Sequence, residues 1–287
     1  MRYQAIRQQS EIYPVRPLCR LLGVSTSGYY AWRQRPVSRR AQENGRLVTA
    51  MQQIHQAVQQ TYGSPRMHAE LVARGFVCGR HRVARLMRQH GLMARMTVRF
   101  RRLTKAGKRE KAADNLLNRQ FQVAAPNHVW ASDITYVPTA EGHVYLAVVL
   151  DLFSRQVVGW AMTSRLGAEL VATALRQALS RRCPDTGLLH HSDRDGLYAS
   201  AAYQHLLAEH QITGSMSRTG NCYDNACVES FFASLKTELV MFERFTNREE
   251  AKMKLFAWIE VFYNRVRRHS TLGYLSPVDF ERDNQHA

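Results

Sequence analysis

The chain has 287 residues, of which 40 are Lys or Arg and 23 are Asp or Glu, so its formal net charge is +17. This length predicts two or three domains. The absence of an apolar run of about 18 residues argues against a membrane span, and the N-terminus lacks the apolar stretch of a secretion signal. We therefore expect a cytoplasmic protein. The five cysteines include no CxxC pair, so they favour neither a disulfide framework nor a structural zinc site.

The positive charge is concentrated in the first part of the chain. Residues 1–125 carry 24 basic and 5 acidic side chains, whereas residues 126–287 carry 16 basic and 18 acidic ones. A polycationic region joined to a nearly neutral one is typical of a nucleic-acid-binding domain attached to another domain. The alternative is a solvated basic surface without a partner.

A helix-turn-helix is predicted within residues 1–44. Leu18, Leu21 and Leu22 mark a short amphipathic helix, and Gly23 begins a break before a second helix capped by Ser25 or Thr26. The second helix ends at Arg33 and Arg35, which we interpret as DNA-binding residues. A plain helical hairpin would give a similar pattern.

Residues 45–98 predict a second basic helical domain. Its helices are expected over residues 45–61, over 64–74 with Ser64 as the cap and Pro65 at the first position, and over 79–90 with Gly91 as the stop. The third helix faces a core with Val83, Leu86 and Met87. Its outer side carries four candidate DNA-binding residues, Arg80, Arg82, Arg85 and Arg88.

Residues 99–125 lack a clean period and read as a basic linker, after which residues 126–287 change character. Three strand patterns follow one another from Val129, and helices then alternate with two further strands. Helices are expected at 167–182, 200–210, about 225–241 and about 248–267. This order predicts an α/β fold in which helices cover both faces of a mixed sheet.

Three acidic residues occupy informative places in this second region. Asp133 lies within the first strand, Asp193 at the end of the fourth strand, and Glu229 on the helix after the fifth. Converging carboxylates are costly unless a cation lies between them, and hard oxygen ligands select Mg²⁺ or Mn²⁺. Two such ions could activate a nucleophile and stabilise a leaving oxygen at a phosphodiester. Taken singly, each acid would more often be a surface charge or a helix cap.

The motifs WASDITYV, HHSDRDGLYAS and NCYDNACVESFFASLKTEL resemble the catalytic motifs of DDE transposases of bacterial insertion sequences, in particular the OrfB type with a retroviral-integrase-like core. The 35 residues between Asp193 and Glu229 match the spacing of that family. The segments TYGSPRMHAELVARG and IEVFYNRVRRHSTLGYLSPVDF resemble its N-terminal helical domain and C-terminal tail. The resemblance implies an RNase H-like integrase catalytic core with sheet order 3-2-1-4-5 and a C-terminal helical tail.

The resemblance also implies a function and partners. Asp133, Asp193 and Glu229 would bind two Mg²⁺ ions, with Mn²⁺ as a substitute, and catalyse cleavage of the ends of the element followed by strand transfer into target DNA. Lys236 would contact DNA as a point charge, although a solvated helix lysine is the alternative. An upstream OrfA product or fusion, a homo-oligomer on DNA and a nucleoid location are implied too.

Two residues depart from the family pattern. Asp195 stands where the family has Gly and Leu197 where it has Gln. If this glycine position required a positive φ, Asp would tolerate that conformation better than most other residues. We hypothesise that Asp195 weakens catalysis, so the competing interpretation is a catalytically impaired DNA-binding remnant or regulator. His190 and His191 are interpreted as strand residues near the site and not as ligands.

Overall fold

The computed structural model describes residues 1–95, 113–218 and 222–284, and it divides into two compact units, Met1–Gln53 and Ile54–Ala287. In the part of the chain described, no helix is long and apolar enough to cross a membrane. The unit boundary falls near the end of α4 (Arg39–Ala57), of which only residues 54–57 belong to the larger unit. The four-part domain division drawn from the sequence stays a prediction.

The first unit contains the predicted helix-turn-helix elements. They are α2 (Val15–Leu21) and α3 (Thr26–Gln34), preceded by α1 (Arg2–Gln9), which the sequence did not predict. Gly23 adopts φ +63° at the break, and the Ser25 hydroxyl accepts a hydrogen bond from the Gly28 N–H at 3.0 Å, as an N-cap does. Arg33 and Arg35 are exposed, and their contact with DNA stays a prediction.

The second helical group is formed by α4, α5 (Ser64–Ala73) and α6 (Arg80–Gln89). One predicted detail is wrong: Gly63, and not Ser64, is the N-cap of α5, and no side-chain cap hydrogen bond forms. The reason is that Pro65, which has no N–H, is tolerated anywhere in the first turn, so it did not fix the cap position. On α6 Val83, Leu86 and Met87 are buried as predicted. The α6 arginines lie outside this core, with Arg80, Arg85 and Arg88 exposed and Arg82 half-buried.

The second region folds around a five-stranded mixed sheet of order β3-β2-β1-β4-β5, as the resemblance implied. The strands are β1 (Val129–Thr139), β2 (Gly142–Asp151), β3 (Val157–Thr163), β4 (Leu189–Ser192) and β5 (Thr213–Met216). β1 and β2 are antiparallel, as are β2 and β3, while β1, β4 and β5 run parallel. The last six residues of β2 are all buried, which explains its nearly continuous apolar sequence.

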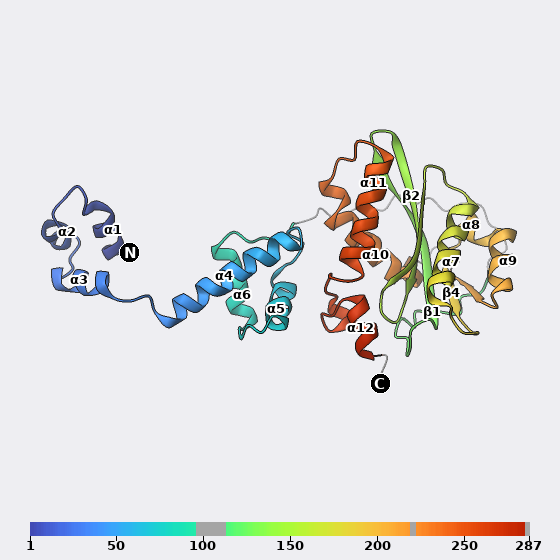
Figure 1. The fold of residues 1–287 in the computed structure, drawn as a ribbon, viewed down its shortest axis with the longest axis horizontal. Coiled ribbons are helices and arrows are strands. Elements are labelled where there is room, and N and C mark those ends of the chain that lie inside the picture. The colour runs from blue at the N-terminus through green and yellow to red at the C-terminus, as the bar shows by residue number, and fades with distance from the viewer. Residues whose placement is uncertain (96–112, 219–221, 285–287) are drawn as a thin grey trace. The chain divides into compact units, whose positions relative to one another are not determined.

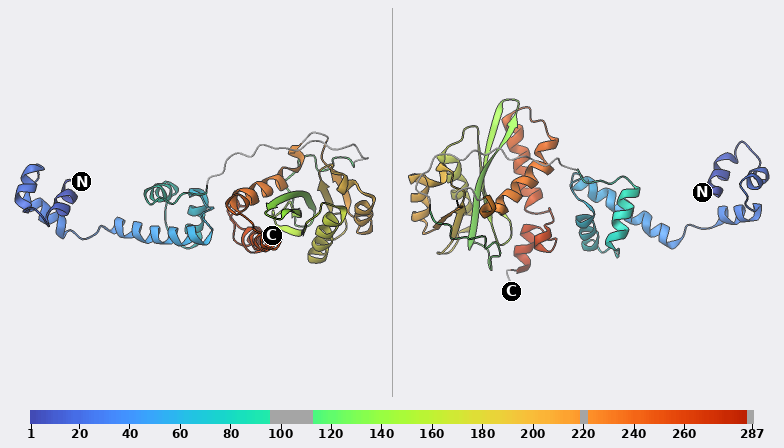
Figure 2. Two further views of the ribbon diagram at one scale, coloured as in Figure 1. Left: turned by 90° about the horizontal axis from the view of Figure 1, so that it is seen from above. Right: turned by 180° about the vertical axis from the view of Figure 1, so that it is seen from behind.

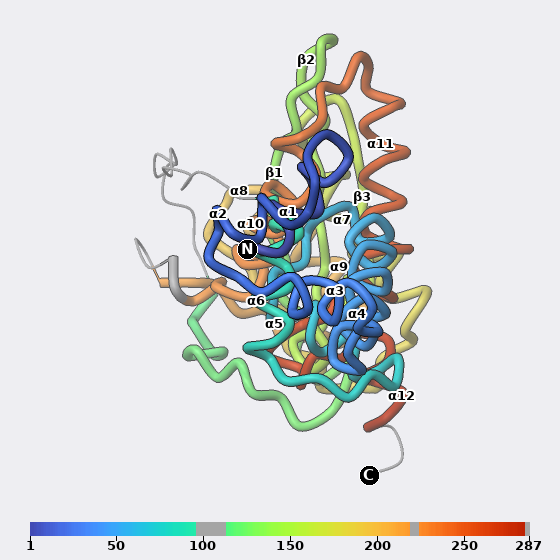
Figure 3. The backbone as a smooth tube through the Cα atoms, turned by 90° about the vertical axis from the view of Figure 1, so that its left-hand side faces the viewer, coloured from blue at the N-terminus to red at the C-terminus, as the bar shows by residue number. Residues whose placement is uncertain are grey.

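Helices cover both faces of this sheet (Figures 1 and 2). α7 (Ala168–Arg182) and α9 (Ala201–Glu209) share one core with Trp130, Ala147 and Val149. On the other face α10 (Ala226–Glu238) and α11 (Arg248–Phe256) enclose a core that includes Leu146 and Val148. Figure 3 shows α11 running beside the β1–β2 hairpin. Short α8 (Gly196–Ala199) was not predicted.

Gly159 of β3 sets the distance between α7 and the sheet. A Cβ at this position would collide with the carbonyl oxygen of Ala174 and lie 2.7 Å from the Cβ of Ala178 and 2.8 Å from its backbone nitrogen. Because these atoms belong to the α7 backbone and to a side chain without torsional freedom, only a shift of the helix could relieve the clash. We expect Gly159→Ala to lower the free energy of unfolding by about 3 kcal/mol. Urea unfolding measures this, and Gly214→Ala, whose added Cβ meets only flexible side-chain atoms at 3.4 Å or more, is the matched control.

The predicted last helix is in fact interrupted. α11 ends at Phe256, a π-helical segment follows over Ala257–Tyr263, and α12 (Pro277–Asn284) ends the described chain. The tail packs on α5 and α10: Arg268 contacts Glu70 of α5, and the Tyr62 hydroxyl accepts from the Arg268 N–H at 2.9 Å. Sequence periodicity cannot show such docking, because the partners lie about two hundred residues apart.

Candidate active site

The register of the sheet places Asp133 and Asp193 beside each other. The parallel pairing of β1 and β4 runs from Val129 with Leu189 to Ser132 with Ser192, and the next residue on each segment is an aspartate. Asp133 remains in the ladder opposite Val148 of β2, whereas Asp193 follows the end of β4. Two aspartates that are distant in the sequence are therefore neighbours at the point where β4 ends.

The electrostatics of the two aspartates reflect this crowding. Burial raises the pKa of the Asp133 carboxyl well above its ordinary value, and the negative charges of Asp193, Glu229 and Asp195 raise it further. Burial also raises the pKa of Asp193 to about 6, and the charge of Asp195 acts in the same direction. A hydrogen bond from the Ile134 N–H to Asp133 Oδ1 at 2.7 Å opposes the shift but does not cancel it.

Glu229 reaches the same place from a different element. It lies in the first turn of α10, whose buried stripe of Val228, Phe232 and Leu235 packs on the sheet as predicted. Glu229 itself is half-buried, and its charge acts on Asp133. Lys236, two turns further along α10, is half-buried too; burial lowers its pKa, and the charge of Asp133 opposes that shift. The structure thus brings Asp133, Asp193, Glu229 and Lys236 to one neighbourhood.

Asp195 has an ordinary backbone conformation. Its φ is −68° and its ψ is 139°, so the position does not need the left-handed conformation that the sequence analysis considered. Its side chain caps α8 by accepting from the Leu197 N–H at 3.0 Å, and its own N–H donates to Asp193 Oδ1 at 3.1 Å. The substitution for Gly is therefore unstrained, and what it adds to the site is a negative charge.

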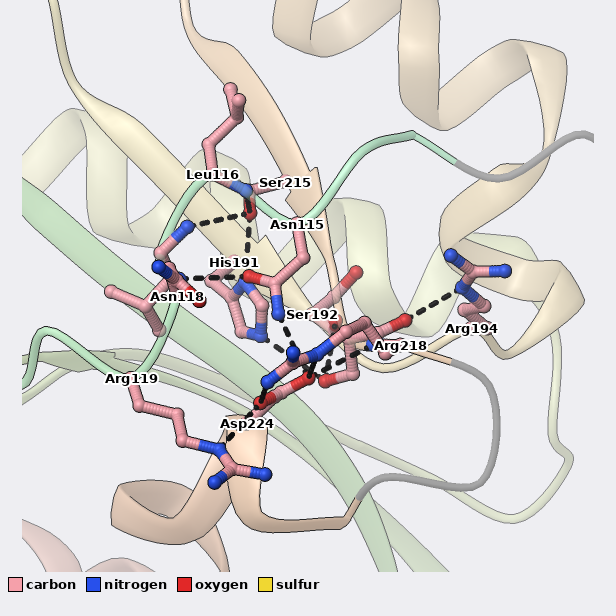
Figure 4. A network of polar contacts seen from close by, with 12 residues as sticks. Asn115, Leu116, Asn118, Arg119, His191, Ser192, Arg194, Ser215, Arg218 and Asp224 are labelled. Carbon is pink, nitrogen blue, oxygen red and sulfur yellow. Dashed lines mark hydrogen bonds and ion pairs between the residues drawn. The ribbon is translucent and has the colours of Figure 1, made fainter.

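Asp224 is a site residue that the sequence analysis missed. Its side chain is fully buried and accepts hydrogen bonds from Arg119 Nε at 3.1 Å, from Asn115 Nδ2 at 2.8 Å and from the Arg218 backbone and guanidinium at 3.0 to 3.2 Å (Figure 4). The Arg218 side chain is the largest of several donors that hold the pKa of this carboxyl far below its usual range. Asp224 joins the segment before β1, the end of β5 and the start of α10. The aspartate in the motif that contains Glu229 was the available signal.

Two histidines of β4 are structural, consistent with their interpretation from the sequence. His191 Nδ1 contacts Ser215 Oγ at 2.9 Å and its Nε2 contacts Ser217 Oγ at 3.1 Å, while His190 Nε2 lies 2.8 Å from Ser132 Oγ. Burial lowers the pKa of His190 to about 3 and that of His191 to about 4, so both rings are neutral at pH 7. They tie β4 to β1 and β5 beneath the aspartates.

Asn225 connects α10 directly to the strand that carries Asp133. Its Nδ2 donates to the backbone oxygen of Ser132 at 3.1 Å. Ser132 directly precedes Asp133, and Asn225 lies one helical turn before Glu229. This bond fixes the start of α10 relative to β1, and so fixes where Glu229 stands relative to Asp133.

The donor chemistry of the site fits a hard divalent cation. The charges of Asp193 and Glu229 raise the pKa of Asp133 in a partly buried place, and a cation among the three carboxylates would remove that repulsion. As the side chains stand, residues 1–95, 113–218 and 222–284 contain no group of three His, Cys, Asp or Glu positioned to hold a metal ion. Metal ligation would thus require the carboxylates to turn toward one another.

Comparison with known proteins assigns the chain to a family. Two models described as integrase core domain match residues 123–222 and 210–277, and one described as HTH-like domain matches residues 42–100. The transposase InsF for insertion sequence IS3A of Escherichia coli K12 is 42% identical over 286 residues, which cover 99% of both chains. The chain belongs to the insertion-sequence transposases. This transposase has the integrase-type core of a polynucleotidyl transferase, as the sequence motifs indicated.

Other similar proteins include a second insertion-element protein and several solved structures. The insertion element IS600 uncharacterized 31 kDa protein of Shigella sonnei is 43% identical over 263 residues, covering 92% of this chain and 97% of that one. Among solved structures, the simian T-cell lymphotropic virus intasome in complex with PP2A regulatory subunit B56 gamma gives a TM-score of 0.48 at 16% identity, covering 80% of this chain and 73% of that one. The HTLV-2 integrase catalytic core domain in complex with magnesium gives 0.42 at 17% identity, covering 55% and 97%.

Proposed function

We propose that this transposase cleaves the ends of its insertion sequence and joins them to target DNA with Asp133, Asp193 and Glu229 as the metal-binding catalytic residues. The register of β1 and β4, which brings the two aspartates to adjacent positions, is the observation that carries the proposal. The carboxylates would hold two Mg²⁺ ions, or Mn²⁺ in their place. Bound there, the ions would supply Lewis-acid activation of the nucleophile and stabilisation of the leaving oxygen.

The residues around the acids would hold the site and the substrate in position. Asn225 and Asp224 fix the start of α10, and therefore the place of Glu229, by their bonds to Ser132 and to Arg218. Lys236 would contact a DNA phosphate near the reacting bond, because its ammonium lies close enough to Asp133 to interact with that charge. Both cleavage and joining are in-line displacements at phosphorus, so one site serves for both.

The basic helices would bind the DNA backbone. The exposed arginines at the end of α3, and those on the outer side of α6, would neutralise phosphates of the element's ends or of the target. They are Arg33, Arg35, Arg80, Arg82, Arg85 and Arg88. Joining two ends favours a homo-oligomer on DNA, and an upstream OrfA product or fusion would complete end recognition.

A cleavage and joining assay tests the proposed function. The full chain, with and without an OrfA fusion, is incubated with duplexes that carry the ends of the element, in Mg²⁺, in Mn²⁺ and with a chelator. We expect strand cleavage that leaves a free 3′-hydroxyl and joins it to a second duplex only when the divalent ion is present. If the chain bound DNA in a salt-sensitive way but cleaved it under none of these conditions, the impaired remnant or regulator would be favoured instead.

Asp195 provides a test of whether this copy is weakened. Its charge acts on both Asp133 and Asp193, and its side chain is held as the cap of α8, so it adds repulsion without being free to turn away. We expect Asp195→Gly to raise the rate of Mn²⁺-dependent end cleavage several-fold, whereas Asp195→Asn, which keeps a capping oxygen, should give much of the same gain. Unchanged rates in both variants would show that the family departure at residue 195 is harmless.

A further inference from the structure

Beyond Asp133, no strand of the described residues pairs with β1 on the side of β4, and an exposed aromatic ring lies in this stretch. β4 pairs with β1 only as far as Ser132, whereas the ladder between β1 and β2 continues to Thr139 (Figure 1). Tyr136 lies in this extension, and 55% of its surface is exposed. A tyrosine so exposed contributes little to the core, so its ring is available to a ligand.

The Tyr136 ring is held in place by its neighbours. It meets the His143 ring edge-on, with centroids 5.0 Å apart and an angle of 85° between the planes. Tyr145, its partner across the ladder, lies beyond His143 with ring centroids 6.2 Å apart. The Lys236 Nζ lies 6.0 Å from the Tyr136 centroid. An ordered ring beside a cation is the pairing used to bind the flat face and the phosphate of a nucleotide.

The position of this ring relative to the acids is defined by Lys236. Tyr136 is three residues from Asp133, which corresponds to about 10 Å along a strand. Because alternate residues of a strand face opposite sides, the two side chains leave β1 on opposite sides. Lys236 is nevertheless near both, since it senses the charge of Asp133 and lies over Tyr136. The Lys236 ammonium therefore connects the acidic site on one side of β1 with the Tyr136 ring on the other.

We propose that Tyr136 is a stacking platform for an unpaired base of the DNA strand that enters the active site. This inference rests on the proposed function and names a feature of the substrate: a frayed or single-stranded segment beside the reacting phosphodiester. At 3.4 Å per stacked nucleotide, about 10 Å places the stacked base within about three nucleotides of that bond. Stacking on a ring tolerates every base, so the platform would bind DNA ends independently of their sequence.

Photocrosslinking tests the placement in the unmodified chain. The probe is a short duplex with a single-stranded tail that carries 5-iodouracil at one of its first three positions, and it needs no sequence from the element. Irradiation couples iodouracil to an aromatic ring on which it stacks, and peptide mass spectrometry locates the adduct. We expect the adduct at Tyr136. An adduct found only at Tyr30 of α3, which is 44% exposed, would overturn the proposal and place base stacking in the helical unit.

Binding measurements with three variants give an independent test. Tyr136→Ala should weaken binding of the tailed duplex by about tenfold, the effect of losing one base–aromatic stack, and weaken binding of a blunt duplex much less, because its terminal bases are paired. Tyr136→Phe should bind both probes as the parent does. Phe256→Ala is the matched control, because that ring is 47% exposed but packs on Trp160 of the edge strand β3.

The two proposals can fail separately in these experiments. Equal affinity of the parent and Tyr136→Ala for the tailed duplex would overturn the stacking platform, even if metal-dependent cleavage is observed. Conversely, the crosslink and the affinity loss could appear in a chain that never cleaves DNA, which would leave the platform standing and remove the catalytic role of the three acids.

Discussion

Glu229→Gln and Asp133→Asn are each expected to abolish metal-dependent cleavage of the element's ends while the chain stays folded. Each change removes a negatively charged oxygen from the proposed ligand set without altering the size of the side chain. Because bound metal ions contribute several kcal/mol to such a reaction, we expect the rate to fall by about a thousandfold or more. The cleavage assay measures the loss, and Asp185→Asn, in the exposed turn before β4, is the matched control.

The same substitutions separate a catalytic role from a structural one. Burial and three neighbouring charges raise the pKa of Asp133 in the folded chain. Its ionisation therefore costs stability, and that cost develops as the pH rises from the unfolded pKa of about 4 through the raised folded value. Without divalent ions at neutral pH, Asp133→Asn should unfold at a higher temperature than the parent. Addition of Mg²⁺ should raise the melting temperature of the parent and not that of the variant.

A melting temperature of Asp133→Asn below that of the parent would contradict the electrostatic crowding at this site. An equal Mg²⁺-induced shift in both proteins would contradict ligation by Asp133. Because neither readout depends on cleavage, a copy impaired by Asp195 would still give an interpretable result.

The sequence predicted the fold wherever a local period or a family motif was present. The alternation after Val129 and the apolar run of β2 predicted the strands correctly, and the family resemblance predicted their order in the sheet. The apolar stripe predicted on α10 is buried. Prediction failed where a helix depends on contacts with residues outside it. α1 has no strong amphipathic pattern, and its helix is held by contacts of Ile6 and Tyr3 with the core around Tyr29. Nothing in the periodicity of residues 1–13 records those contacts.

The parts of the site that were missed depend on partners distant in the chain. Residues 99–125 were interpreted as a linker from their charge, and part of that segment, residues 99–112, lies outside the described residues. Within residues 113–125, however, Leu117 is buried in the core of the α10 face and Arg119 binds Asp224 across 105 positions. Composition shows that such a segment is basic, but not that one arginine meets a buried carboxylate.

The second large effect is expected at Arg267, which clamps the far end of the helix that carries Glu229. Arg267 Nε and Nη2 bind the Glu238 carboxylate at 2.7 and 2.6 Å, and both side chains are at least 90% buried. Arg66 of α5 adds a contact to Glu238 at 3.3 Å, so the basic helical domain, the tail and α10 share one carboxylate. Arg267→Met would leave that carboxylate without its bidentate partner. We expect it to lower the free energy of unfolding by about 3–5 kcal/mol.

Urea unfolding followed by tryptophan fluorescence measures this change, because Trp130 and Trp258 are buried in the two cores that the sheet separates. The double variant Arg267→Met with Glu238→Leu should recover most of the loss, since replacing both members of a buried pair removes the unpaired charge. Arg176→Ala, which breaks the exposed pair with Glu169, should change stability by less than about 0.5 kcal/mol. If Arg267→Met were no more damaging than Arg176→Ala, the tail would not be anchored through Glu238. Glu229 would then owe its position to Asn225 and Asp224 at the near end of α10 alone.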